Sequence, residues 1–402
     1  MKPNHHALTF GLISTFLTGL GFTIIAPVVP FLVAPFANHS NQAFIVTALT
    51  AIYAGCTFLA APAMGALSDR YGRKVILLTC LAGSSIGYLV FGLAGALWML
   101  FLGRIIDGLT GGNIVALFAY FADITKAEER TKIFGWAAAA VGIGTITGPT
   151  FGGLLAHFGN SVPFYFGAFI CLLNLVYGLF AMPESLAVDK RLSKLPLNRI
   201  NPFTALFDVL TMRNLSKLFI VGFFLWIPAG AMQAIISQFT WDSFAWRPVA
   251  IGLVFSIMGL QDIVTQTLIM KHLLKHFNDK QLINLAIVSE LIGYTLMALS
   301  AITQFWPIFI LAMFIYAFGD SVFGTAFNGR LSKQASDSEQ GKLQGGSQAL
   351  QSLARIAGPL IGGEIYILFG HSAPALMGII LLVAALFTLR KREDNAEKEN
   401  IL

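Results

Sequence analysis

Long apolar stretches alternate with short polar segments along nearly the whole chain. A helix needs about 20 mostly apolar residues to cross the hydrocarbon core of a bilayer. Twelve segments are about that long or longer, and the excess length of several permits tilt or curvature. The predicted spans are residues 8–36, 42–66, 75–94, 96–122, 132–157, 163–182, 216–241, 249–271, 280–302, 304–330, 340–368 and 372–390. The pattern therefore predicts an all-α membrane protein with twelve transmembrane helices.

Composition supports a lipid environment and excludes a water-soluble globule. Only 11% of the residues are charged and 56% are hydrophobic, whereas a soluble domain carries about 25% charged residues. The net charge of +6 does not indicate nucleic-acid binding, because the cations lie in short loops and not on one soluble face. The three cysteines lie in apolar runs without metal-ligand spacing, so we expect no metal and no cofactor.

The positive charges predict the orientation in the membrane. With the N-terminus in the cytoplasm, all but three of the 26 lysines and arginines fall in cytoplasmic segments. The exceptions are Arg247 in an outer loop and Arg104 and Arg355 within spans. This distribution follows the positive-inside rule. We therefore expect a multi-pass protein of a bacterial cytoplasmic membrane, with both termini in the cytoplasm.

A weak internal repeat indicates two halves. "GTITGPTFGG" (144–153) matches "RIAGPLIGG" (355–363), and "RTKIFG" (130–135) faces "QGKLQG" (340–345) at the same offset of 210 residues. Many secondary transporters are built from such repeats, with the substrate site near the midplane between them. We expect a six-helix bundle over 1–182, a cytoplasmic linker over 183–215, a second, pseudo-symmetric bundle over 216–390 and a cytoplasmic tail over 391–402.

Three motifs in order carry a family resemblance. They are "GALSDRYGRK" (65–74) between the second and third spans, "GRIIDGLTGG" (103–112) in the fourth span and "GIGTITGPTFGG" (142–153) in the fifth. The first resembles the G-x-x-x-D-R-x-G-R-K motif of the major facilitator superfamily, and its matching residues include Gly65, Asp69, Arg70, Gly72 and Arg73. The third resembles the motif of drug/proton antiporters in that family. The resemblance covers essentially the whole chain.

The resemblance implies roles for two of these motifs. In the first, Asp69 and Arg73 would make charged contacts that hold the cytoplasmic side closed, with Asp123 as a partner. In the third, a flexing or leak-sealing helix would depend on Gly144, Gly148, Pro149 and Gly152. The alternative for the first motif is a topological anchor alone. The alternative for the third is close helix packing alone, because glycines four residues apart share one helical face.

The chain resembles the bacterial twelve-helix drug exporters, especially the tetracycline-exporter group, but it departs from the acid pattern of that group. The resemblance places acids in the first and third helices of those exporters. The corresponding residues here are Thr18 and Gly87, whereas an acid in the ninth helix is retained as Glu290. The departures put tetracycline itself in doubt as the substrate and leave the export architecture in place.

Charged residues within the spans are the candidates for proton coupling. They are Arg104, Asp107, Asp262, Glu290, Asp320 and Arg355. A charge at the bilayer centre costs about 2.5–3.5 kcal/mol, so these groups must pair, face a cavity or be protonated. We expect Asp320 and Asp262 to carry the proton, with Asp107 and Glu290 as further candidates. Arg104 would pair with Asp107, three residues away, and Arg355 would serve as a second buried counter-charge.

Polar faces on several spans predict a central aqueous cavity that receives the substrate. Charge within a span requires such a cavity or a partner, and polar residues at helical spacing recur in the spans that carry these acids. The candidate cavity residues are Asn113, Trp226, Gln233, Gln238, Gln266, Gln348 and Gln351.

Together these features predict proton-coupled efflux of a lipophilic or amphipathic small molecule by alternating access. The chain has no G-x-x-x-x-G-K-[ST] loop for ATP, so a proton gradient is the expected energy source. Alternatives are a facilitator or importer of a polar metabolite, a lipid or glycolipid translocator, and a non-transporting receptor. The sequence contains no combination of a nucleophile and a base that would indicate a hydrolytic enzyme. We expect a monomer that contacts membrane lipids, protons and a small-molecule substrate, and no nucleic acid.

Overall fold

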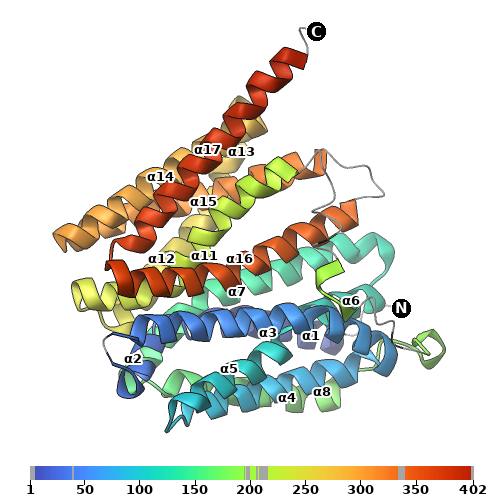
Figure 1. The fold of residues 1–402 in the computed structure, drawn as a ribbon. Helices are drawn as coiled ribbons and strands as arrows, with labels where there is room; N and C mark the ends of the chain where they lie inside the picture. Colours follow the sequence, from blue (N-terminus) through green and yellow to red (C-terminus); the bar gives the residue numbers. More distant parts are fainter. Residues whose placement is uncertain are drawn as a thin grey trace. The chain divides into compact units, whose positions relative to one another are not determined.

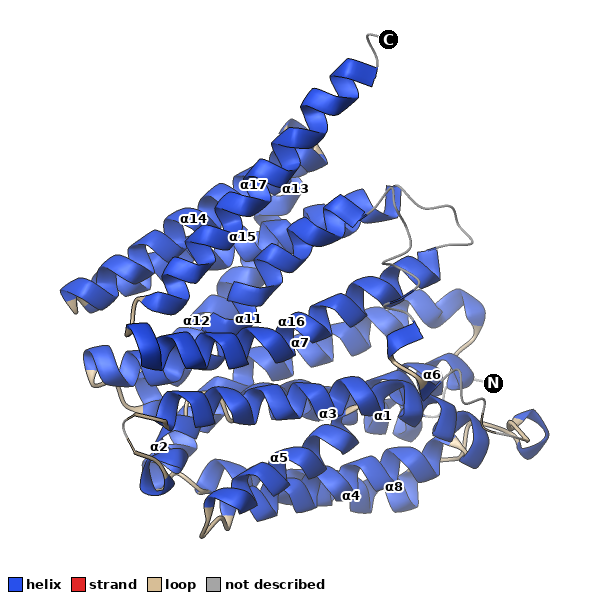
Figure 2. Ribbon diagram, in the orientation of Figure 1, coloured by secondary structure: helices blue, strands red, loops and turns tan. Residues whose placement is uncertain are grey.

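The computed structural model describes residues 5–38, 40–193, 195, 200–204, 207, 216–333 and 340–399. Those residues are largely helical and contain no β-strand (Figure 2). Within them, eleven helices are long and apolar enough to cross a membrane, and a shorter apolar helix covers Ala373–Leu389. These helices coincide with the twelve predicted spans. The predicted all-α membrane fold is therefore confirmed.

The chain divides into two compact units. Unit 1 comprises Met1–Asn38, Leu49–Pro202 and Arg247–Ser256, and unit 2 comprises His39–Ala48, Phe203–Trp246 and Ile257–Leu402. Much of the expected linker, including residues 196–199 and 208–215, lies outside the described residues.

Unit 1 contains the helices that carry the three motifs. They are α1 (His5–Thr23), α2 (Val29–Val33), most of α3 (Gln42–Tyr71), α4 (Arg73–Gly92), α5 (Leu97–Gly111), α6 (Ile114–Ile124), α7 (Arg130–Leu155) and α8 (Val162–Ala181). Helix α1 packs along α7, and α4 packs between α5 and α8 (Figure 1). Helix α1 also contacts α8.

Unit 2 repeats this packing with the second set of helices. They are α11 (Ser216–Phe244), the second part of α12 (Pro248–Val264) from Ile257 onward, α13 (Met270–His276), α14 (Asp279–Thr303), α15 (Trp306–Lys333), α16 (Gln340–Phe369) and α17 (Ala373–Glu399); the first part of α12 belongs to unit 1. Helix α11 packs along α16, α14 contacts α15 and α17, and α11 also contacts α17. The same pairs form in both units, which is what a duplicated six-helix sequence predicts. Helix α17 continues to Glu399, so residues 391–399 of the expected tail are helical.

Three predicted spans are interrupted and not single α-helices. The first ends as α1 at Thr23, before two prolines at 27 and 30, and helix resumes at α2. Proline lacks the N–H that a continuous helix requires. The fourth breaks at 112–113, between α5 and α6, where a Cβ on Gly112 would lie 2.8 Å from the backbone nitrogen of Ala61. The eighth contains a π-helical turn over Thr265–Ile269, an irregularity that often marks functional positions.

Candidate functional site

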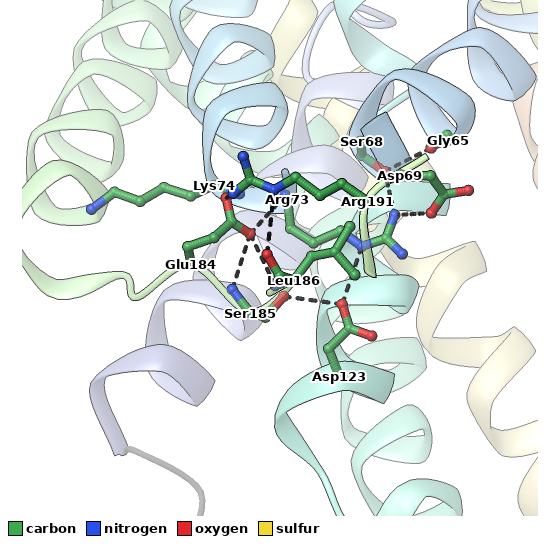
Figure 3. A network of polar contacts seen from close by, with 10 residues as sticks. All are labelled: Gly65, Ser68, Asp69, Arg73, Lys74, Asp123, Glu184, Ser185, Leu186 and Arg191. Atoms are coloured by element: carbon green, nitrogen blue, oxygen red, sulfur yellow. Dashed lines mark hydrogen bonds and ion pairs between the residues drawn. The ribbon is translucent and has the colours of Figure 1, made fainter. Parts of the chain in front are cut away.

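The loop between α3 and α4 holds a buried arginine between two acids (Figure 3). Helix α3 ends at Tyr71 and α4 begins at Arg73, separated by Gly72 in the left-handed region with φ +103°. The Arg73 guanidinium lies 2.6 Å from Asp69 and 3.1 Å from Asp123 at the end of α6, and it donates to the Ser68 hydroxyl at 2.5 Å. The structure therefore brings together the three residues for which the resemblance implied a contact.

The other two residues of this motif have different surroundings. A Cβ on Gly65 would lie 3.1 Å from Cγ1 of Val115, so this glycine allows α3 to approach α6. The Arg70 guanidinium lies 5.2 Å from the centre of the Tyr71 ring, within the range of a cation–π contact. Among the contacts of the described residues, Arg70 does not join the Asp69–Arg73–Asp123 group.

Sequence analysis missed three residues of this cluster. Glu184 accepts a hydrogen bond from the backbone N–H of Arg73 at 2.9 Å, and the Ser185 hydroxyl donates to Asp123 at 3.0 Å. Arg191 lies 3.5 Å from the Glu184 carboxylate. All three belong to the polar segment after α8, for which the sequence indicates only a linker. The signal was a proline and glutamate directly after an apolar span, but sequence does not say which helix end that carboxylate meets.

Arg104 and Asp107 form a buried pair within unit 1. Both are 3% exposed, and the guanidinium lies 3.4 Å from the carboxylate. Arg104 also sits 4.0 Å from the centre of the Tyr53 ring and donates to the carbonyl of Leu49 at 3.5 Å. The expected local pair is present, and it leaves the fourth span with two charges that offset one another inside the protein.

Asp107 faces a small polar cavity between α1, α3, α4, α5 and α8. The cavity is lined by Ser14, Leu17, Thr18, Tyr53, Leu81, Ser84, Tyr88, Asp107, Gly111, Asn113 and Cys171. The Thr18 hydroxyl donates to the Asn113 amide oxygen at 3.3 Å. Gly87 packs directly against the fourth span, since a Cβ there would lie 3.0 Å from Cβ of Asp107. Thr18 and Gly87, the two departures from the exporter acid pattern, thus both adjoin the region of Asp107.

Unit 2 gathers a second charged group from three helices. Asp320 on α15 interacts electrostatically with Asp262 on α12 and with Arg355 on α16. Gln266 donates to both carboxylate oxygens of Asp262 at 2.9 Å. Asp320 and Arg355 are exposed although they lie in the middle of spanning helices. Three of the predicted charges, far apart in sequence, therefore interact electrostatically within unit 2.

Glu290 on α14 lies in the interior of unit 2. It is 1% exposed, and neither carboxylate oxygen has a hydrogen-bond partner among the described residues. Its Cγ packs on α15 at Gly319, where a Cβ would lie only 2.9 Å away. Glu290 interacts electrostatically with Asp320. An acid in such surroundings is costly to ionise.

The glycines of the third motif bring α7 against α1. A Cβ on Gly144 or Gly148 would collide with α1, at Phe16 and Thr23 respectively, and a Cβ on Gly152 would collide with Ile24, directly after α1. On another side of α7, Gly252 of α12 approaches the carbonyl of Pro149. The Ser256 hydroxyl of α12 donates to the Ile146 carbonyl at 2.9 Å. The glycines of this motif therefore permit close packing of α7, and this holds whether or not the motif has a further role.

The predicted cavity glutamines and tryptophan fall into two classes. Gln233, Gln266 and Gln348 are exposed, and Gln351 is half-buried with its amide 3.4 Å from a serine hydroxyl one turn away. Trp226 instead packs in an aromatic cluster, with its ring 5.0 Å from that of Phe327.

Gln238 belongs to a buried polar network near the end of α11. Its amide donates to both carboxylate oxygens of Asp242, at 2.9 and 3.0 Å, and the Gln42 amide donates to its oxygen at 3.2 Å. The Tyr366 hydroxyl donates to Asp242 at 2.8 Å. The ring of His371 stacks on that of Tyr366 with 5.0 Å between the centres. Sequence analysis did not identify this network, because its members come from three separate helices and a loop.

Comparison with known proteins identifies the family from sequence and finds solved structures with a similar fold. A sequence model of the Major Facilitator Superfamily matches residues 11–241 and 218–401. The chain is 34% identical to the class C tetracycline resistance protein of Escherichia coli over 385 residues, which cover 96% of this chain and 95% of that protein. It is 28% identical to multidrug resistance protein 2 of Bacillus subtilis (strain 168), over 95% of this chain and 94% of that protein. The crystal structure of the nucleoside transporter NupG superposes with a TM-score of 0.74 at 13% identity, covering 97% of this chain and 98% of that one.

Proposed function

This chain belongs to the Major Facilitator Superfamily, and we propose that it exports a lipophilic or amphipathic small molecule in exchange for protons by alternating access. It is a transporter and not an enzyme, and a multi-pass protein of a bacterial inner membrane. Relatives named for tetracycline and multidrug resistance favour export over a polar-metabolite importer or a lipid translocator.

One observation carries the proton-coupling part of this proposal: the group formed by Asp262, Asp320 and Arg355. These three residues come from α12, α15 and α16, lie in the middle of spanning helices, and interact electrostatically. A lipid-facing charge would cost about 2.5–3.5 kcal/mol at the bilayer centre. The exposed face that carries Asp320 and Arg355 is therefore proposed to contact water and substrate and not hydrocarbon.

The charge balance of this group allows exchange. With both acids ionised, two negative charges face one arginine, so the group carries one excess negative charge. Binding of one proton neutralises that excess, and so does binding of a cationic substrate. Two ligands that neutralise the same charge compete, which is the thermodynamic requirement for antiport. Asp320 is proposed as the carrier because it is exposed, in contrast to Glu290.

Glu290 and Asp107 are proposed to have supporting roles. Glu290, buried without a hydrogen-bond partner among the described residues, is proposed to hold its proton while Asp320 exchanges one. Asp107 is proposed to take part in proton coupling through its pair with Arg104. Its carboxylate lines the cavity that is also lined by Thr18 and Asn113. These roles are distinct, because Asp107 has a charged partner at hydrogen-bond range and Glu290 does not.

The remaining expectations complete the proposal. Both termini are proposed to lie in the cytoplasm, since this orientation places most lysines and arginines on that side. The Asp69–Arg73–Asp123 group then lies at the cytoplasmic end of unit 1, where it is proposed to act as a gate. The working protein is proposed to be a monomer surrounded by lipid.

The test is proton release from acid-loaded inside-out vesicles, followed with a pH-sensitive dye as lipophilic cationic, neutral and anionic compounds are added. Wild-type protein should release protons with at least one compound, and Asp320→Asn and Asp262→Asn should reduce that release. Glu364→Gln is the matched control, because Glu364 is an exposed acid near the C-terminal end of α16. Absence of release with every compound, from folded wild-type protein, would refute proton-coupled export.

A further inference from the structure

The segment Glu184–Leu192, directly after α8, lies against the loop between α3 and α4 and contacts it at several points (Figure 3). The backbone N–H of Leu192 donates to the Asp69 carbonyl at 3.0 Å. The Ser185 hydroxyl donates to Asp123 at 3.0 Å. The segment therefore contacts both acids that hold the Arg73 side chain.

Glu184 supplies the hydrogen-bond acceptor that the start of α4 lacks. The first N–H groups of a helix have no partner within the helix and carry a partial positive charge. Gly72 precedes α4 and offers no side chain to cap it. The Glu184 carboxylate accepts from the N–H groups of Arg73 and Lys74 at 2.9 and 3.3 Å.

The carboxylate is itself held in place. It accepts from the backbone N–H groups of Ser185 and Leu186 at 3.0 and 3.1 Å, and the Arg191 guanidinium lies 3.5 Å away. Arg191 in turn donates to the Leu186 carbonyl at 3.4 Å. Glu184 thus ties the start of α4 to a closed turn of the following segment.

This arrangement accounts for the glycine at position 72. Its φ of +103° is unfavourable for other residues. In addition, a Cβ there would collide with the Glu184 carboxylate and lie 2.9 Å from Arg191 Nη2. Any side chain at this position would displace the carboxylate from the end of α4.

We propose that Glu184 is a positioning residue for the cytoplasmic gate and that Glu184–Leu192 is a strap that keeps the gate closed. Arg73 is held at both ends, with its backbone N–H on Glu184 and its guanidinium on Asp69 and Asp123. The first turn of α4 cannot move away from Asp123 without also breaking its contact with the strap. Removal of the Glu184 carboxylate therefore favours the state that is open to the cytoplasm.

The experiment measures how readily a cysteine is reached from the cytoplasm. Cys56, Cys80 and Cys171 are replaced by alanine, and Gln348→Cys places a reporter on the exposed polar face of α16. A membrane-impermeant maleimide is added to inside-out vesicles and the alkylation rate is measured. Glu184→Ala should raise that rate about tenfold, the lower limit for loss of one charge-assisted hydrogen bond. Asp189→Asn, which alters an exposed acid of the same segment, should leave it unchanged.

A charge swap separates helix capping from the ion pair. Glu184→Arg with Arg191→Glu restores an opposite pair but leaves the α4 N–H groups without an acceptor from position 184. This variant should alkylate as fast as Glu184→Ala, and a return to the wild-type rate would overturn the proposal. An unchanged rate in Glu184→Ala, with the protein monodisperse and at normal yield, would overturn it as well. Where Glu184→Ala does not accumulate, Gly72→Ala tests the same displacement. Because no transported compound is needed, the outcome does not depend on the proposed proton-coupled export.

Discussion

A double-mutant cycle on Arg104 and Asp107 tests whether the buried charges of unit 1 act as a pair. The two charged groups lie 3.4 Å apart and both residues are 3% exposed. At an effective dielectric constant of about 20, unit charges at that distance attract by about 5 kcal/mol. Removal of one partner leaves a buried charge uncompensated, which costs about 3–5 kcal/mol. Removal of both charges leaves two neutral polar groups and should cost much less than the sum.

The variants are Arg104→Gln, Asp107→Asn and the double variant, each purified in detergent. Unfolding free energies are measured by circular dichroism in mixed micelles with increasing denaturing detergent. We expect each single variant to lose about 3–5 kcal/mol and the coupling energy to be about 3–5 kcal/mol, bounded by the Coulomb term. Additive single effects, with coupling below about 0.5 kcal/mol, would refute the pair as an interacting unit. Proton release by the double variant then shows whether the pair also contributes to transport.

Further substitutions test the packing of α7, the gate and the network at the end of α11. Gly148→Ala places a Cβ into α1 and should destabilise the protein by about 1–3 kcal/mol. Gly142→Ala is the control, because the space around its Cβ is open and no destabilisation is expected. The unfolding free energy of both variants is measured in denaturing detergent. Arg73→Lys keeps the positive charge, but a lysine cannot contact Asp69, Ser68 and Asp123 together. Transport, measured as flux, should therefore fall, whereas size-exclusion chromatography should show that the variant still folds. Asp242→Asn and Tyr366→Phe should each cost about 1–3 kcal/mol, because a buried partner loses its hydrogen bond; equal stability of variants and wild type would contradict that network.

The length and apolarity of the helices could be read directly from the sequence. An α-helix satisfies its own backbone hydrogen bonds, so in a bilayer about twenty apolar residues are enough to specify a span without knowledge of its neighbours. The interruptions were less predictable. Pro27 and Pro30 are visible as breakers, but the break at 112–113 and the π turn at Thr265–Ile269 depend on packing against other helices.

The candidate charges were also identified from sequence, because a charged residue within a span is costly and therefore informative. Their grouping was only partly predictable. The pair Arg104 and Asp107 follows from a spacing of three residues on one helix, whereas the group of Asp262, Asp320 and Arg355 required the packing of three helices.

The sequence by itself determined the all-α membrane fold, the likeness of its two halves and its family, because these depend on local periodicity, composition and contiguous motifs. Only the tertiary structure decided which charges meet, that Glu290 is sealed inside unit 2 without a hydrogen-bond partner among the described residues, and that Glu184 caps α4. Those contacts join residues separated by tens to more than a hundred positions. Side-chain hydrogen bonds act over about 3 Å, so no pattern along the chain specifies them until the helices have packed.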